Sequence, residues 1–199
     1  MSGAVSLFAP PGEISSPMVR QMFAYWQGKC AGRMAPKPRD IEPGDLKRLL
    51  PFISISDVLN DPFDLRFRLV GTSVVEAVGY DFTGKRLNEM PVTTGLEHWL
   101  AHYQRVVEHK GPHYGRYRGE LGPDSVRYVD HGAFPLSSQG ENVDRIIEIE
   151  DWSGVPGVTL GKPDLPIWRF QALPSPTPAD KLSPDIAQGQ AMPRGEPAA

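Results

Sequence analysis

Hydrophobic residues recur every three or four positions in two stretches of the chain, a spacing that is typical of amphipathic helices. The first stretch is 17–30, where Val19, Met22 and Trp26 share one face behind a capping Ser16. The second is 94–110, whose apolar arc consists of Trp99, Leu100, Tyr103, Val106 and Val107. Shorter helices are expected at 45–50 and 73–78. Each long helix should bury one face against the rest of the protein.

Five other runs are rich in β-prone residues and are separated by turn-forming residues. They cover 52–59, 65–71, 113–121, 125–136 and 143–151. The first two are joined by a short loop and form a hairpin. Because an isolated hairpin is only marginally stable, the order of elements predicts an α+β fold with one five-stranded antiparallel sheet. Helices are expected between strands 2 and 3, together with an additional N-terminal helix.

Proline divides the chain into regions, since nine of its 21 prolines follow Trp152. Regular structure cannot persist at that density. We expect a flexible N-terminus at 1–16, a helix and its connection at 17–38, a folded domain at 39–152 and a Pro-rich, largely disordered tail at 153–199.

Composition narrows the function classes. The formal net charge of −3 argues against nucleic-acid binding, and the single cysteine excludes an intrachain disulfide. The sequence contains no apolar run long enough to span a membrane and no signal-peptide pattern at its start. A cytoplasmic protein with no membrane or nucleic-acid partner is therefore expected.

Several motifs resemble the proteobacterial PAS-type domains. They are Leu49-Leu50-Pro51, Asp57-Val58, the run from Phe67 to Thr72 that reads FRLVGT, and the turn from Gly79 to Leu87 that reads GYDFTGKRL. Phe82 stands where leucine is usual in this turn. The resemblance implies a PAS fold that encloses a small pocket. It brings neither a catalytic motif nor one common ligand, so it implies sensing or interaction, and no cofactor is expected.

Strand alternation and the helical arc predict which side chains line that pocket. Tyr103, Tyr128 and His131 would supply its polar contacts, and a filled core without a ligand is the alternative. The predicted lining is Ile55, Phe67, Leu69, Val78, Trp99, Tyr103, Val106, Tyr117, Tyr128, His131 and Phe134.

The histidines of the second long helix are candidates for metal binding. His98, His102 and His109 form a stripe, but that stripe lies well away from the centre of the apolar arc, so a solvated helix face is favoured over a metal site. Haem-binding PAS domains aim a histidine of this helix into the pocket, and these three point elsewhere. We therefore expect neither a metal nor haem, and we expect His131 to be a core histidine bonded to backbone.

Arginines alternate with apolar residues on three predicted strands. If those strands were neighbours, the guanidinium groups could hold an anion, although pairing with Glu120, Glu148 and Glu150 as ordinary sheet surface is favoured. The predicted anion patch is Arg66, Arg68, Arg116, Arg118 and Arg127.

These observations predict a non-enzymatic sensory or regulatory domain that binds a small ligand, a protein partner or both. One alternative is an interaction module without a ligand, which dimerises through Met22, Phe23 and Trp26, although packing of these residues on their own sheet is equally expected. A further alternative is an acid–base enzyme that uses His131 with Asp130 or Glu120. Its mark would be a polar pocket that brings His131 within reach of a carboxylate.

Overall fold

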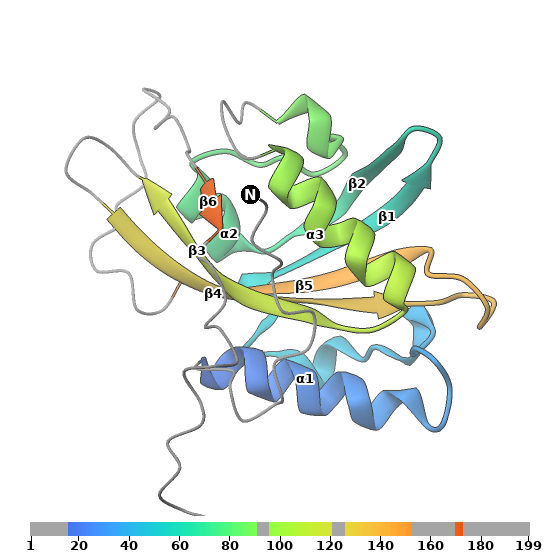
Figure 1. The fold of residues 1–199 in the computed structure, drawn as a ribbon. Coiled ribbons are helices and arrows are strands. Elements are labelled where there is room, and N and C mark those ends of the chain that lie inside the picture. Colours follow the sequence, from blue (N-terminus) through green and yellow to red (C-terminus); the bar gives the residue numbers. More distant parts are fainter. Residues whose placement is uncertain (1–15, 91–95, 121–125, 153–169, 173–199) are drawn as a thin grey trace, which may run out of the picture. The chain divides into compact units, whose positions relative to one another are not determined.

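Six strands form one antiparallel sheet in the computed structural model of the chain, in the spatial order β2-β1-β5-β4-β3-β6 (Figure 1). The strands are β1 (Ile53–Asn60), β2 (Phe63–Val70), β3 (His113–Glu120), β4 (Val126–Leu136), β5 (Arg145–Asp151) and the short β6 (Phe170–Ala172). β1 and β2 form a hairpin, and β5 pairs with β1 on one side and with β4 on the other. β5 therefore lies inside the sheet, and its residues from Ile146 to Ile149 are buried.

The structure describes residues 16–90, 96–120, 126–152 and 170–172, and for 118–120, 126–128 and 170–172 only the backbone is considered. All of these residues belong to one unit that spans Ser6–Leu173. Within these ranges, each helix is too short or too polar to cross a lipid bilayer.

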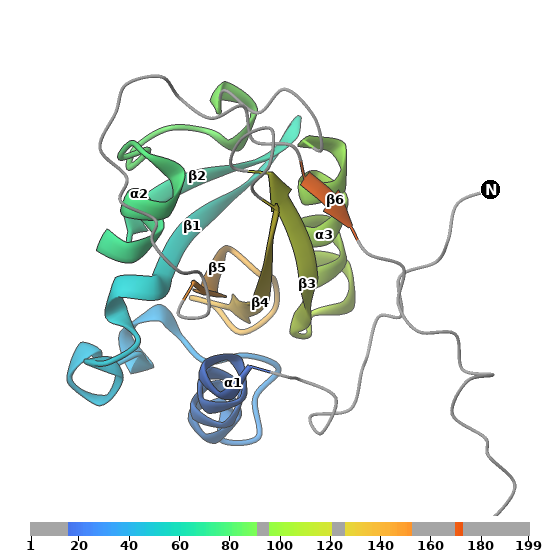
Figure 2. The ribbon, with the colours of Figure 1, turned by 90° about the vertical axis from the view of Figure 1, so that its left-hand side faces the viewer.

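Helix α1 (Pro17–Cys30) covers one face of the sheet and packs on β4 and β5 (Figure 2). Ser16 begins the helix, because its hydroxyl accepts hydrogen bonds from two backbone N–H groups of the first turn at 3.1 and 3.2 Å. The indole of buried Trp26 donates to the carbonyl of Pro135 at 2.7 Å, which fixes the helix to β4. The core on this face consists of Val19, Met22, Trp26, Ala35, Leu46, Leu49, Ile53, Phe134, Leu136, Ile147 and Ile149.

Helices α2 (Thr72–Val78) and α3 (Leu96–His109) lie on the opposite face (Figures 1 and 2). α3 packs on β2, β3 and β4. The hydrophobic core beneath them consists of Leu65, Phe67, Val74, Ala77, Phe82, Leu87, Tyr103, Val106, Tyr117, Val129, Ala133, Val143, Ile146 and Trp152. Because the sheet is covered on both faces, both sets of alternating side chains along its inner strands are buried.

A β-bulge interrupts the pairing of β1 with β2. Ile55 pairs with Leu69, but the next residue, Ser56, pairs with Phe67, so Arg68 is the extra residue. Phe67 therefore faces α3, whereas the side chain of Leu69 is 42% exposed. The expectation that both residues face the helices is wrong for Leu69, because the bulge reverses the alternation between them.

The predicted α+β class is confirmed, with all five expected strands, helices between strands 2 and 3, and the N-terminal helix. β6 adds a sixth strand, and it falls in the segment 153–199 that was expected to be a tail. The rest of that tail and residues 1–15 lie outside the described residues. The helix expected at 45–50 is replaced by two 3₁₀ turns, Pro43–Leu46 and Leu50–Phe52, because the proline at 51 cannot continue an α-helix.

Candidate functional site

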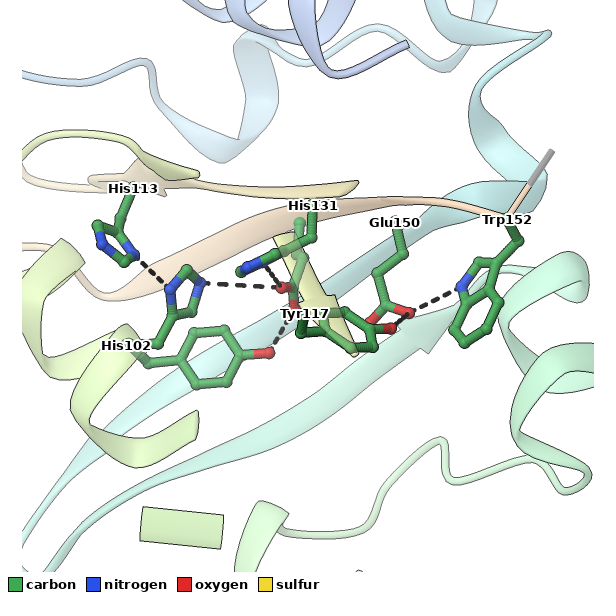
Figure 3. A network of polar contacts seen from close by, with 8 residues as sticks. His102, His113, Tyr117, His131, Glu150 and Trp152 are labelled. Carbon is green, nitrogen blue, oxygen red and sulfur yellow. Dashed lines mark hydrogen bonds and ion pairs between the residues drawn. The ribbon is translucent and has the colours of Figure 1, made fainter. Parts of the chain in front are cut away.

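A row of polar side chains crosses the core between α3 and the sheet (Figure 3). Five of them, which we call the polar cluster, are His102 and Tyr103 from α3, His113 from β3, His131 from β4 and Glu148 from β5. Tyr117, Glu150 and Trp152 continue the row beyond His131 (Figure 3). Such a row is unusual in a domain core, where buried polar groups must find partners.

Strand alternation explains why carboxylates point into this core. In β5, Ile147 and Ile149 face α1, so Glu148 and Glu150 between and after them face α3. β1 follows the same rule, because buried Ser54 lies opposite Glu148 in the β1–β5 register. The polar residues of both strands therefore meet on the α3 face.

Three imidazole rings are packed side by side at one end of the row. His102 lies between His113 and His131, with ring centroids 4.4 and 4.6 Å apart (Figure 3). Their exposed fractions are 6%, 6% and 7%. The Nδ1 atoms of His102 and His113 form a hydrogen bond with each other. In this contact one ring must donate and the other must accept, which fixes the tautomers of the two rings jointly.

Burial sets the protonation of two of these rings. It is the main cause that lowers the pKa of His102 well below its usual value, with further lowering from His131 and His113. Burial, followed by the neighbouring His131, also lowers the pKa of His113 to about 3. Both rings are therefore neutral near pH 7, and each presents one N–H group and one lone pair.

Glu148 is the centre of the polar cluster and is only 3% exposed. Its Oε2 accepts a hydrogen bond from the hydroxyl of Tyr103. Its Oε1 lies 3.3 Å from Nδ1 of His131 and 3.9 Å from Nε2 of His102. Among the described residues, these two histidines are the basic side chains within 4.0 Å of the Glu148 carboxylate, and neither a lysine nor an arginine is within salt-bridge distance.

A second carboxyl group follows along the row. Oε2 of Glu150 accepts hydrogen bonds from the hydroxyl of Tyr117 at 3.1 Å and from the indole of Trp152 at 2.8 Å (Figure 3). Burial first, and then the nearby Glu148, raise the pKa of Glu150 to about 8. The same core region thus holds two acidic groups on one strand.

Several buried polar atoms in this region have no hydrogen-bond partner within the described part of the chain. They are Nε2 of His102, Nε2 of His113 and Oγ of Ser54. One ring nitrogen each from His102 and His131 and one oxygen of Glu148 all lie within 4.8 Å of one another, a spacing at which the three groups could hold a metal ion. Within the described residues, these atoms therefore keep unused hydrogen-bonding or ligating capacity inside the core.

Residues 14–141 match the family model of the PAS domain, which is more than half of the chain. The chain belongs to the PAS domain family. Among solved structures, it is similar to the PAS domain of a protein from Colwellia psychrerythraea, with 17% identity and a TM-score of 0.38 over 54% of this chain and 92% of that one. No curated protein matches the sequence. Membership of the family supports a sensory or regulatory role in general.

The residues predicted to line the pocket of this PAS domain divide between three locations. Those on the α3 face are Phe67, Val78, Trp99, Tyr103, Val106, Tyr117 and His131. Ile55 and Phe134 instead pack on the α1 face, which corrects their assignment, and Leu69 is exposed. The cause is the burial of both sheet faces, since an apolar strand residue can then belong to either core. The side chain of Tyr128 lies outside the description.

The prediction that the histidines of α3 form a solvated face is wrong for His102 and agrees with the structure for His98 and His109. His98 and His109 are exposed, as a solvated face requires, but His102 is buried. It is buried because His113 and His131 from the sheet provide polar partners at the border of the apolar arc. His131 also differs from expectation, because within the described part of the chain its ring hydrogen-bonds the carboxylate of Glu148 and not backbone.

The predicted anion patch does not form one cluster. Arg66 and Arg68 belong to β2, and three strands separate β2 from β3, the strand of Arg116 and Arg118. Arg68 pairs with Asp57 at 2.9 Å. Toward the other edge of the same sheet, Arg116 of β3 pairs with Asp130 of β4 at 2.7 Å. The side chains of Arg118 and Arg127 lie outside the description.

Glu148, His102 and His113 are the site residues that sequence reasoning missed. The signal for Glu148 is present in the order Ile147, Glu148, Ile149, because an acidic residue between two isoleucines must be buried if both faces of the strand are covered. The signal for the histidines is weaker, because it requires knowing that three distant segments meet.

Proposed function

We propose that this PAS domain is a non-enzymatic sensory or regulatory module that binds a small ligand at the polar cluster. One observation carries the proposal: buried ring nitrogens of His102 and His113 have no partner among the described residues, although they lie beside a buried carboxylate. Each such orphan atom costs roughly 1–3 kcal/mol in a folded protein. A ligand that contacts these atoms would recover that cost.

The surrounding side chains would give such a ligand a defined orientation. Trp99 packs edge-on against His102 at 5.7 Å and against His131 at 5.3 Å between ring centroids, and it stacks on Tyr103 at 5.8 Å. Aromatic walls with a few convergent polar groups are typical of small-molecule sites. Binding would act through α3, because two members of the polar cluster belong to that helix.

Native mass spectrometry of the chain purified from its own host tests this proposal. We expect a mass excess over the sequence mass that disappears when the same sample is denatured. Glu148→Gln should reduce the excess, whereas His98→Gln, which changes an exposed histidine of the same helix, should retain it. A bare mass for the wild-type chain would argue against a retained ligand and would favour the interaction module.

The interaction module requires a surface for its partner. The structure argues against the dimer contact predicted for α1, because Met22 and Trp26 are buried against the domain's own sheet and could not reach a partner. Phe23 is partly buried beside Tyr114 and Phe134. Partner binding would therefore use another surface, and the oligomeric state read from the same mass spectra tests self-association.

An acid–base enzyme is the second candidate, because His131 lies within reach of a carboxylate as that alternative requires. The carboxylate is Glu148, at 3.3 Å from Nδ1 of His131. Asp130 instead accepts hydrogen bonds from Arg116, so we do not expect it to act as the acid–base partner of His131. We place this candidate second, since both groups are nearly fully buried. If a substrate is found, an unchanged rate in His131→Ala would remove it.

A further inference from the structure

Three groups of the polar cluster have the chemistry and the spacing of metal ligands. Ligands at bond lengths of about 2.0–2.1 Å lie roughly 3.3 Å apart around a tetrahedral ion. Nδ1 of His131 and Oε1 of Glu148 are 3.3 Å apart, and Nε2 of His102 is 3.9 Å from the same oxygen. To coordinate one ion, His102 must approach Glu148 by roughly half an ångström, and the ring nitrogens of His102 and His131, which lie within 4.8 Å of each other, must also move closer together.

Two of the three ligands, His102 and Glu148, are held by a second contact on their far side. His113 hydrogen-bonds Nδ1 of His102, which leaves Nε2 of that ring directed toward Glu148. Tyr103 donates to Oε2 of Glu148 and leaves Oε1 for the histidines. Metal sites in proteins use such outer contacts to fix the tautomer and the direction of their ligands.

The same arrangement is poorly satisfied without a cation. When Nδ1–H of His102 donates to His113, Nε2 of His102 carries a lone pair that faces the carboxylate oxygen at 3.9 Å. Two acceptors then face each other in a buried region. When the donor is His113 instead, Nε2–H of His102 points across the same 3.9 Å, which is too long for a hydrogen bond. A cation between Nε2 of His102 and Oε1 of Glu148 would accept a lone pair from each atom.

We propose that His102, His131 and Glu148 bind a divalent first-row transition-metal ion, with Zn²⁺ as the first choice. Two imidazoles and one carboxylate suit zinc and its neighbours, whereas Mg²⁺ and Ca²⁺ prefer ligand sets made of oxygen. A fourth position would stay open for water or a signal molecule. This inference rests on the proposed function, because it names the ligand class for the same cluster.

Isothermal titration of the full chain with ZnCl₂, after treatment with EDTA and dialysis, tests the proposal. We expect one site per chain, and no heat with MgCl₂. His102→Gln and Glu148→Gln should weaken Zn²⁺ binding by more than the roughly 10–100-fold that the loss of an outer contact costs, and His113→Gln should weaken it by about that amount. His98→Gln and His109→Gln are matched controls and should bind like the wild type.

Cobalt provides a readout that does not depend on any variant folding correctly. Co²⁺ added to the wild-type chain should give the intense visible absorption of a four-coordinate site, and Zn²⁺ should abolish it by displacement. Circular dichroism of each variant shows whether its fold is retained before its binding is compared. The weak spectrum of fully hydrated Co²⁺ would overturn the proposal.

The remaining outcomes separate this inference from the function on which it rests. Zn²⁺ binding that survives His102→Gln and Glu148→Gln but is lost in His98→Gln or His109→Gln would place the ion on the surface and overturn the inference. No Zn²⁺ binding, together with an organic ligand in the native mass spectrum, would overturn the metal and leave the sensory function standing. Neither a metal nor an organic ligand would overturn both.

Discussion

Tyr103→Phe isolates the energetic contribution of one hydrogen bond in the polar cluster. The substitution removes the hydroxyl that donates to Glu148 and keeps the ring that stacks on Trp99 at 5.8 Å between centroids. Burial, followed by the carboxylate of Glu148, raises the pKa of Tyr103 well above its usual value, so the hydroxyl remains a donor at neutral pH. Because a hydrogen bond to a charged group contributes about 1.5–3 kcal/mol, we expect a loss of that size in the free energy of unfolding.

Urea denaturation in metal-free buffer measures this loss as a lower midpoint with an unchanged m-value. Tyr25→Phe is the matched control, because the hydroxyl of Tyr25 accepts from the backbone N–H of Glu42 at 2.8 Å in an exposed setting. That variant should lose less than about 0.5 kcal/mol, as surface substitutions usually do. Equal losses in the two variants would refute the view that Glu148 depends on Tyr103 in a desolvated core.

Three further predictions concern packing, capping and metal. Gly132→Ala should lower the free energy of unfolding by about 1–3 kcal/mol in urea melts, because a Cβ there would lie 2.9 Å from a methyl group of Val19. Gly28→Ala is the control and should be neutral or stabilising, because a Cβ there would have nothing within 4 Å. Equal effects of the two substitutions would contradict the close approach of α1 to β4. Ser16→Ala should lower the free energy of unfolding by about 1 kcal/mol in the same assay, because it removes the cap of α1 and a 2.5 Å hydrogen bond to Asp151. An unchanged free energy of unfolding would mean that this cap does not stabilise the helix. Saturating Zn²⁺ should raise the melting temperature and EDTA should reverse the increase, while an unchanged melting temperature would count against binding to the folded state.

The sequence predicts the fold of this chain well because the signals that define it are local. Hydrophobic spacing identifies α1 and α3, and turn residues separate the five main strands. The bulge at Arg68 is not visible in this way, because alternation in 65–71 looks regular until β1 is present to pair with it. Because Arg68 is unpaired in the bulge, the side chain of Leu69 lies at the surface.

The site is harder to predict because its residues are brought together by the fold. His102 lies at the border of the apolar arc, and whether that border is buried depends on His113 and His131 in strands that come later in the chain. Glu148 reads as a surface partner for arginine when only one sheet face is assumed to be covered. Once α1 is known to pack on Ile147 and Ile149, the same alternation places the glutamate in the opposite core.

A crystal structure of the chain as purified from its own host, with diffraction data that include anomalous signal, tests the central claim most directly. The account predicts density for a bound species in contact with His102, His131 and Glu148, and an anomalous peak at that position if the species is a transition metal. Density that shows only these side chains packed against one another, with no bound species between them, would contradict the claim that the polar cluster is a ligand site.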